Sequence, residues 1–127
     1  MSIHLSEFPY KLNYELNKKD KMMLTIDVDG NPEEVEKNII NLGYTFYKRK
    51  TSKGYHYIVA DKKGKPIVGD FWKIMKLRIK IGDDKFRIML DYIRYKKGVK
   101  KFGILFNNKN GYKFEKFKYI YGRKRRT

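Results

Sequence analysis

The sequence predicts an α+β domain with a mostly antiparallel sheet. The stretch Met22–Asp29 alternates apolar and polar side chains, which is typical of a half-buried strand. The stretch that follows, GNPEEVEKNIINLG, has the capping residues and apolar spacing of a helix, and the later apolar runs are short and separated by turn residues. Because 127 residues suit one modest core, we expect a single domain over residues 1–127.

The first strand and the helix after it are the best-marked elements. The strand is expected to place Leu24, Ile26 and Val28 on one face, and Thr25, Asp27 and Asp29 on the other. In the helix, Asn31 can cap, Pro32 suits the first position and Gly43 is placed to end it. The expected buried stripe of this helix is Val35, Ile39 and Leu42.

The remaining elements are predicted from shorter signals. Residues 44–50 and 55–61 predict two strands joined by a turn at 52–54. Residues 69–84 are ambiguous: alternating apolar positions from Met75 to Ile81 slightly favour a strand, whereas Phe71, Ile74, Met75 and Arg78 fit a helix. Residues 85–95, KFRIMLDYIRY, alternate again and predict a strand. Residues 102–106 and 112–121 predict a hairpin around Asn110-Gly111, and residues 1–21 give no clear prediction.

The charge of the chain is strongly positive and unevenly distributed. The net charge is +17, but residues 1–40 carry −3, whereas residues 41–127 hold 26 basic and 6 acidic side chains. A field of this sign favours a polyanion, and nucleic acid is the commonest one inside a cell. The alternative explanation for the positive charge is that lysine is common in all proteins of the source organism. Residues 122–127, GRKRRT, predict a basic tail.

Several classes of protein are excluded or disfavoured. The chain has no cysteine, which excludes a disulfide scaffold and a thiolate zinc site. No apolar run approaches the roughly 20 residues of a membrane span, and the start, MSIHLSEFPYKLN, lacks the apolar core of a signal peptide. We therefore expect a soluble cytoplasmic protein with no membrane partner. The sequence does not indicate the oligomeric state.

Two aspartates one residue apart stand out in a chain this basic. Asp27 and Asp29 leave the same strand face about 6 to 7 Å apart, which is close enough to reach one hard cation or two adjacent ones. Ligation of Mg²⁺ or Mn²⁺ would relieve their repulsion. The alternative is a solvated face on which the pair is ordinary surface charge. Two more candidates are Asp91, in the apolar stretch RIMLDYI, and His56, in GYHYIVA; a lone histidine in a strand is usually structural.

Taken together, three motifs resemble those of the archaeo-eukaryotic primase superfamily. LTIDVDG places two aspartates after an apolar strand, SKGYHYIVAD places a histidine within a strand, and RIMLD ends an apolar strand in aspartate. The stretch LRIKIGDDKFRIMLD is also similar to the segment that leads into the third motif in small viral and plasmid members. The resemblance covers roughly residues 22–107.

This resemblance implies a primase- or polymerase-like nucleotidyltransferase built on an RRM-like sheet with helices packed on one face. It implies that Asp27, Asp29 and Asp91 hold the catalytic Mg²⁺ or Mn²⁺ ions. It also favours a helix over residues 69–82, against the alternation of apolar residues there. Nucleotidyl transfer needs cations near the attacking and leaving oxygens, which is chemistry that clustered carboxylates can support.

The resemblance also implies a nucleotide site and a nucleic-acid partner. The phosphates of an incoming nucleoside triphosphate would contact His56 and the turn before it, which consists of Ser52, Lys53 and Gly54. The basic remainder of the chain would hold single-stranded DNA or a primer-template. The chain is short for this family and has no zinc-binding set, so a minimal, accessory or inactive version is also open.

Two other functions remain open from the sequence. One is a non-catalytic module of the same fold, in which aromatic and lysine side chains on the sheet hold single-stranded nucleic acid. The other is a metal-dependent nuclease, or a replication initiator that uses tyrosine. The initiator is disfavoured because His4 and His56 are the only histidines, so no His-hydrophobic-His metal motif exists.

Overall fold

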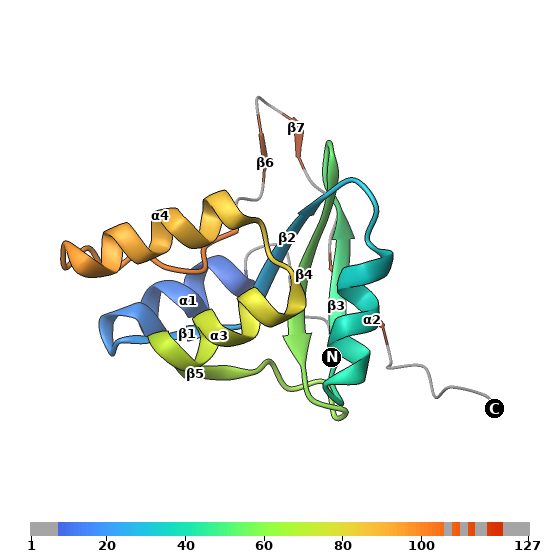
Figure 1. The fold of residues 1–127 in the computed structure, drawn as a ribbon, viewed down its shortest axis with the longest axis horizontal. Helices are drawn as coiled ribbons and strands as arrows, with labels where there is room; N and C mark the ends of the chain where they lie inside the picture. The colour runs from blue at the N-terminus through green and yellow to red at the C-terminus, as the bar shows by residue number, and fades with distance from the viewer. Residues whose placement is uncertain (1–7, 106–107, 110–111, 114–116, 121–127) are drawn as a thin grey trace.

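The computed structural model describes residues 8–105, 108–109, 112–113 and 117–120. Four helices and eight strands follow one another along these residues (Figure 1). In chain order they are α1 (Phe8–Lys18), β1 (Lys21–Met23), β2 (Thr25–Asp29), α2 (Glu33–Asn41), β3 (Thr45–Lys50), β4 (Gly54–Ala60), β5 (Val68–Asp70), α3 (Phe71–Ile81), α4 (Lys85–Lys96), β6 (Asn108–Lys109), β7 (Tyr112–Lys113) and β8 (Lys118–Ile120).

The main sheet has four strands in the order β2-β4-β3-β8, and each strand is antiparallel to its neighbours. Because β4 lies between β2 and β3, the segment β2-α2-β3 forms a split β-α-β unit. Two smaller antiparallel pairs, β1–β5 and β6–β7, complete the strands of the described residues. The fold is therefore α+β with mainly antiparallel sheets, as the sequence predicts.

The first strand and helix form for the reasons that the sequence indicates. Leu24, Ile26 and Val28 are buried on one face of β2. The Asn31 side-chain oxygen accepts a hydrogen bond from the Glu33 backbone N–H at 2.9 Å, which caps the start of α2. Gly43 has a φ of +88°, which a side chain would disfavour, and the helix ends there.

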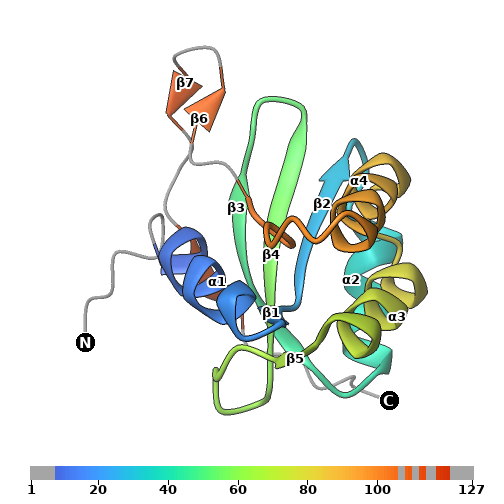
Figure 2. The ribbon, with the colours of Figure 1, turned by 90° about the vertical axis from the view of Figure 1, so that its left-hand side faces the viewer.

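Both faces of the main sheet are covered (Figures 1 and 2). On one face, α2 and α3 pack against the apolar side chains of β2, β3 and β4. On the opposite face, α1 and residues near 105 and 117 form a second apolar cluster; it contains Met23, Ile58, Leu105 and Phe117, with Leu12 and Leu16 of α1. The sequence gives no prediction for α1. Its buried Asn13 joins it to the rest, because the side-chain amide donates to Gly103 O and the side-chain oxygen accepts from Met23 N.

Residues 71–96 form two helices side by side, α3 and α4 (Figures 1 and 2). For α3, the alternation of apolar residues is misleading, and the helix implied by the primase resemblance is confirmed. The strand predicted over residues 85–95 is wrong, because this segment is α4. Asp70 caps α3 by accepting from Lys73 N, and Asp84 caps α4 by accepting from Phe86 N and Arg87 N. These caps and the buried ion pairs between the helices outweigh the two-residue alternation.

The predicted C-terminal hairpin is present in part. β6 and β7 pair as Asn108↔Lys113 and Lys109↔Tyr112, while the turn residues 110 and 111 lie outside the described residues. The strand predicted over residues 102–106 is wrong for residues 102–105, which form no strand. Instead, Phe102 and Leu105 are buried and Gly103 accepts side-chain hydrogen bonds, so this segment lies across the sheet as a packed connection. The predicted basic tail, residues 122–127, also lies outside the described residues.

Candidate functional site

The pairing of β2 with β4 brings Asp27 directly opposite His56. The pairing of β4 with β3 then places Arg49 opposite His56, so these three side chains form a row on one sheet face. Asp29 lies on the same face of β2, opposite Gly54, with an exposed side chain. The first two predicted motifs therefore meet on one face of the sheet, and Asp27 and Asp29 share that face as the alternation in β2 predicts.

His56 is a buried, neutral imidazole. Its Nδ1 accepts hydrogen bonds from Arg49 Nε at 3.1 Å and Nη2 at 3.0 Å. Because a guanidinium only donates, Nδ1 carries no proton, and the ring proton is on Nε2, 3.7 Å from Asp27 Oδ1. Burial, helped by the nearby charges of Arg49 and Arg87, lowers the pKa of His56 to about 3. Arg49 is itself held against the Phe117 ring, with its guanidinium carbon 4.3 Å from the ring centroid.

Asp27 holds its proton more strongly than an exposed aspartate. Burial raises the pKa of the Asp27 carboxyl from 3.8 to about 6, although the positive charge of Arg87 opposes this shift. Neighbouring carboxylates, first of all Asp29, raise it further. Asp27 is therefore a carboxyl group that titrates within the physiological range, beside a histidine that does not.

Asp91 lies in a different environment from the one predicted for it. It is in α4, 2% exposed, and both carboxylate oxygens accept hydrogen bonds from the protein. Oδ2 accepts from Arg78 Nη1 at 2.8 Å and from Gly103 N at 2.9 Å, and Oδ1 accepts from Arg94 Nη1 at 3.3 Å. The side chain thus joins α3, α4 and residue 103. Its position in a strand beside the two other aspartates was predicted incorrectly, because the alternation in KFRIMLDYIRY concealed a helix.

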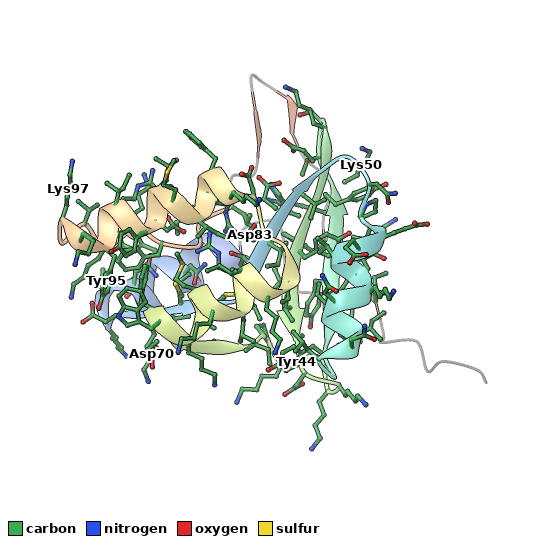
Figure 3. All side chains as sticks on the ribbon, viewed as in Figure 1. Tyr44, Lys50, Asp70, Asp83, Tyr95 and Lys97 are labelled. Carbon is green, nitrogen blue, oxygen red and sulfur yellow. The ribbon has the colours of Figure 1, made fainter. Side chains whose placement is uncertain are left out.

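Asp83 is a central residue of the site that sequence reasoning missed. Its Oδ2 accepts from Arg78 Nε and Arg87 Nη1, both at 2.7 Å, and its Oδ1 accepts from Asp27 N at 2.8 Å. Arg87 continues the network to the carbonyl and hydroxyl oxygens of Thr25 at 3.0 and 2.5 Å. Figure 3 shows Asp83 between the α3–α4 turn and the sheet. A signal was present in GDDKFR, where Asp83 and Arg87 stand four residues apart, the spacing of a helical ion pair.

A pocket of about 200 Å³ opens beside this network. It is formed by the row on the sheet, by α4 and by the segment that follows α4. Its lining residues are Asp27, His56, Asp84, Phe86, Arg87, Leu90, Asp91, Arg94, Lys101, Ile104 and Leu105. Because the basic and acidic side chains of this lining are balanced, the pocket combines a titratable carboxyl, a neutral imidazole and several cations without a large net charge.

The predicted turn residues have a structural role at the end of the sheet. Ser52 and Lys53 are exposed and do not line the pocket, and Gly54 N donates to Thr51 Oγ1 at 3.1 Å. A Cβ at Gly54 would come within 1.8 Å of the Val28 carbonyl oxygen, so only glycine allows β2 and β4 to approach here. This turn lies next to Asp29 rather than next to the pocket.

The residues present do not fit the metal centre that the primase resemblance implies. Within the described residues, no group of three or more His, Cys, Asp or Glu side chains is placed to hold a metal ion. Asp27 and Asp29 share a face, but the oxygens of Asp91 are bound by arginines and a backbone amide. A cation would have to displace these donors to gain the third carboxylate. No metal-dependent step is therefore derived for this site.

Comparison of the chain with protein-family models, curated proteins and solved structures finds no match. Among the described residues, no helix is long and apolar enough to cross a membrane. The function is therefore inferred from the geometry and the charges of this chain alone.

Proposed function

We propose that this domain binds single-stranded nucleic acid through a basic surface, without catalysis of its own. The proposal depends on one observation, which is that the described acidic side chains of the basic region already accept hydrogen bonds within the protein. Residues 41–127 hold six acidic side chains, and five of them lie in the described part of the chain. Every one of these five accepts hydrogen bonds from the protein itself; they are Asp61, Asp70, Asp83, Asp84 and Asp91.

The lysines of the same region differ from these carboxylates in their exposure to solvent. Every lysine between residues 49 and 105 has an exposed side chain. The carboxylates are therefore committed to caps, turns and buried ion pairs, while these lysines are exposed, although Lys100 lies 3.2 Å from Asp20. A surface of this kind produces a positive field that a phosphate backbone neutralises, with release of counterions.

The preference for single strands follows from the exposed aromatic side chains. Trp72, Phe86 and Tyr92 of α3 and α4 are each more than two-fifths exposed, and flat exposed rings stack on unpaired bases. The location differs from the one that the sequence suggests, because both faces of the main sheet are covered. The binding surface is thus expected on the helices rather than on the sheet.

The proposal is tested by titration of the protein with labelled single-stranded oligonucleotides. Lys73→Gln/Lys76→Gln/Lys80→Gln removes three exposed charges from α3, and Lys18→Gln/Lys19→Gln/Lys21→Gln is the matched control from the acidic N-terminal region. We expect the first variant to bind several-fold more weakly, with a salt slope reduced by about 0.7 for each phosphate that it no longer neutralises. The control variant should bind nearly as the wild type does. Equal affinity of all three proteins, or no binding at all, would refute the proposal.

A second candidate function is the nucleotidyl transfer that the primase resemblance implies. The specific observation in its favour is that Asp27 and His56, from two separate motifs, lie opposite each other and line one pocket. Against it stands Asp91, whose carboxylate is bound by arginines. The test is to record thermal melts with Mn²⁺ and a nucleoside triphosphate, together with primer-extension assays. Melting temperatures that rise in the wild type but not in Asp27→Asn/Asp29→Asn, together with extension of the primer, would favour catalysis.

A further inference from the structure

The outward faces of α3 and α4 carry large exposed side chains and no exposed carboxylate. α3 contains no acidic residue, and the only one in α4, Asp91, is buried. Trp72 is 48% exposed and Tyr92 is 42% exposed, and their ring centroids are 6.1 Å apart across the two helices. Together with Lys76 and Lys96, these two rings define a surface that we call the α3–α4 aromatic patch.

The Trp72 ring is held in place by neighbouring aromatic side chains of α3 and α4. It makes edge contacts with Phe71 at 5.1 Å and with Tyr95 at 5.5 Å between ring centroids. Tyr95 in turn stacks on Phe71 at 3.9 Å, and Phe71 is 2% exposed. Asp70 and Tyr95 mark this end of the helix pair in Figure 3. Because it packs against the buried Phe71 and the partly buried Tyr95, the Trp72 ring is presented to solvent at little further loss of side-chain entropy.

The lysines of the patch follow from helix geometry. Lys76 lies four residues after Trp72 in α3, and Lys96 lies four residues after Tyr92 in α4, so each lysine is next to a ring on its own helix. Ammonium groups beside a ring suit a ligand whose flat bases alternate with phosphates.

We propose that the α3–α4 aromatic patch is where single-stranded nucleic acid stacks its bases, with Trp72 as the principal platform; this rests on the proposed function. The positive charge of the patch indicates which kind of ligand can bind there. A second copy of the chain, packed face to face, would bring these lysines against lysines, and the only exposed carboxylate at the described ends of α3 and α4 is Asp70, which already caps α3. A neutral apolar partner would leave the lysines without compensation. A polyanion with planar bases satisfies both the rings and the charges.

Trp72 is the only tryptophan of the chain, so its fluorescence reports on this patch alone. We expect a single-stranded homopyrimidine oligonucleotide to quench that fluorescence at saturation. Trp72→Ala should bind the same labelled oligonucleotide about 5- to 100-fold more weakly, the range for loss of one stacked base, and Trp72→Phe should recover part of the loss. Circular dichroism of each variant checks that it is folded.

The matched control is Tyr14→Ala in α1. Tyr14 is 52% exposed and has Lys18 four residues later, 4.8 Å above its ring, but its helix also carries the exposed Glu15. We expect this variant to bind as the wild type does. Binding of Trp72→Ala at wild-type affinity, without quenching in the wild type, would refute the patch and leave the proposed function standing. No oligonucleotide binding by any of these proteins would remove the proposed function too. A blue shift of Trp72 with anionic vesicles but not with oligonucleotide would instead identify a lipid surface and overturn the proposal.

Discussion

Asp27 and His56 lie opposite each other on β2 and β4, with His56 Nε2 3.7 Å from Asp27 Oδ1. Their protonation is shifted in opposite directions: the pKa of Asp27 is raised to about 6, and the pKa of His56 is lowered to about 3. Burial is the main cause of both shifts, because it disfavours the charged form of either group. The pair is therefore held close to neutrality at mildly acidic pH.

Asp27→Asn should stabilise the protein near neutral pH. Because the folded-state pKa of about 6 lies above the unfolded value of 3.8, the wild type loses stability as the pH rises from about 4 to about 6. The asparagine variant lacks this loss. We expect a gain in the free energy of unfolding on the order of 1 kcal/mol at pH 7.5, which shrinks toward zero at pH 4. Urea unfolding at both pH values measures it, and a variant that is less stable than the wild type at pH 7.5 would contradict the raised pKa.

His56→Gln should change the acid side of the stability profile. Because the folded-state pKa of about 3 lies below the ordinary 6.5, His56 gives the wild type stability that is present above pH 6.5 and lost as the pH falls toward 3. The glutamine variant has no such titration, so its stability should fall less between pH 6.5 and 4. Melting temperatures over this range test the prediction, and parallel curves for the two proteins would show that His56 is not buried in its neutral form.

Asp91→Ala should destabilise the fold strongly. The substitution leaves Arg78, which is fully buried, without a charge partner that accepts its Nη1 hydrogen bond at 2.8 Å, and it removes the acceptor for Gly103 N. We expect a loss of about 3 kcal/mol or more, the usual effect of breaking a buried ion pair. Chemical denaturation measures it. A variant as stable as the wild type would mean that Asp91 is available for another role, as the primase resemblance implies.

Gly54→Ala should weaken the pairing of β2 with β4. The added Cβ would meet the backbone of Val28, with its carbonyl oxygen at 1.8 Å, and backbone cannot move aside as the end of a side chain can. We expect a loss of roughly 2 kcal/mol or more. Gly30→Ala is a useful comparison, because its Cβ would meet nothing within 4 Å and the strain comes from its φ of +88° alone. A larger loss at Gly30 than at Gly54 would contradict this assignment.

The parts of the fold that the sequence predicts correctly are those with strong local signals. β2 follows a two-residue alternation with one apolar face, α2 has a capping residue and a terminal glycine, and β3–β4 have a turn between them. These signals act over neighbouring residues, so they are visible without knowledge of the tertiary structure. The placement of Asp27 and Asp29 on one face follows from the same regularity, whereas the placement of His56 opposite Asp27 depends on the register between β2 and β4.

The errors arise where distant contacts decide the structure. Residues 85–95 alternate like a strand, but their inward side chains include Arg87 and Asp91, which pair with Asp83 and Arg78. The Arg78–Asp91 pair joins two different helices, so a local period could not indicate it, whereas the Asp83–Arg87 pair has the four-residue spacing of a helix. The same error placed Asp91 in a strand instead of in α4, and it hid Asp83 as the residue that links the turn before α4 to β2.

The most direct test of the account is the salt dependence of binding to single-stranded nucleic acid. The affinity of the wild type for a short labelled oligonucleotide should be measured by fluorescence anisotropy between about 50 and 400 mM monovalent salt. On α3 and α4 the exposed lysines have no exposed carboxylate to compete with a bound phosphate. We therefore predict that log K falls linearly with log salt, by about 0.7 for each phosphate neutralised, and that several phosphates contribute. An affinity that does not change with salt, or no binding at the lowest salt, would contradict the account.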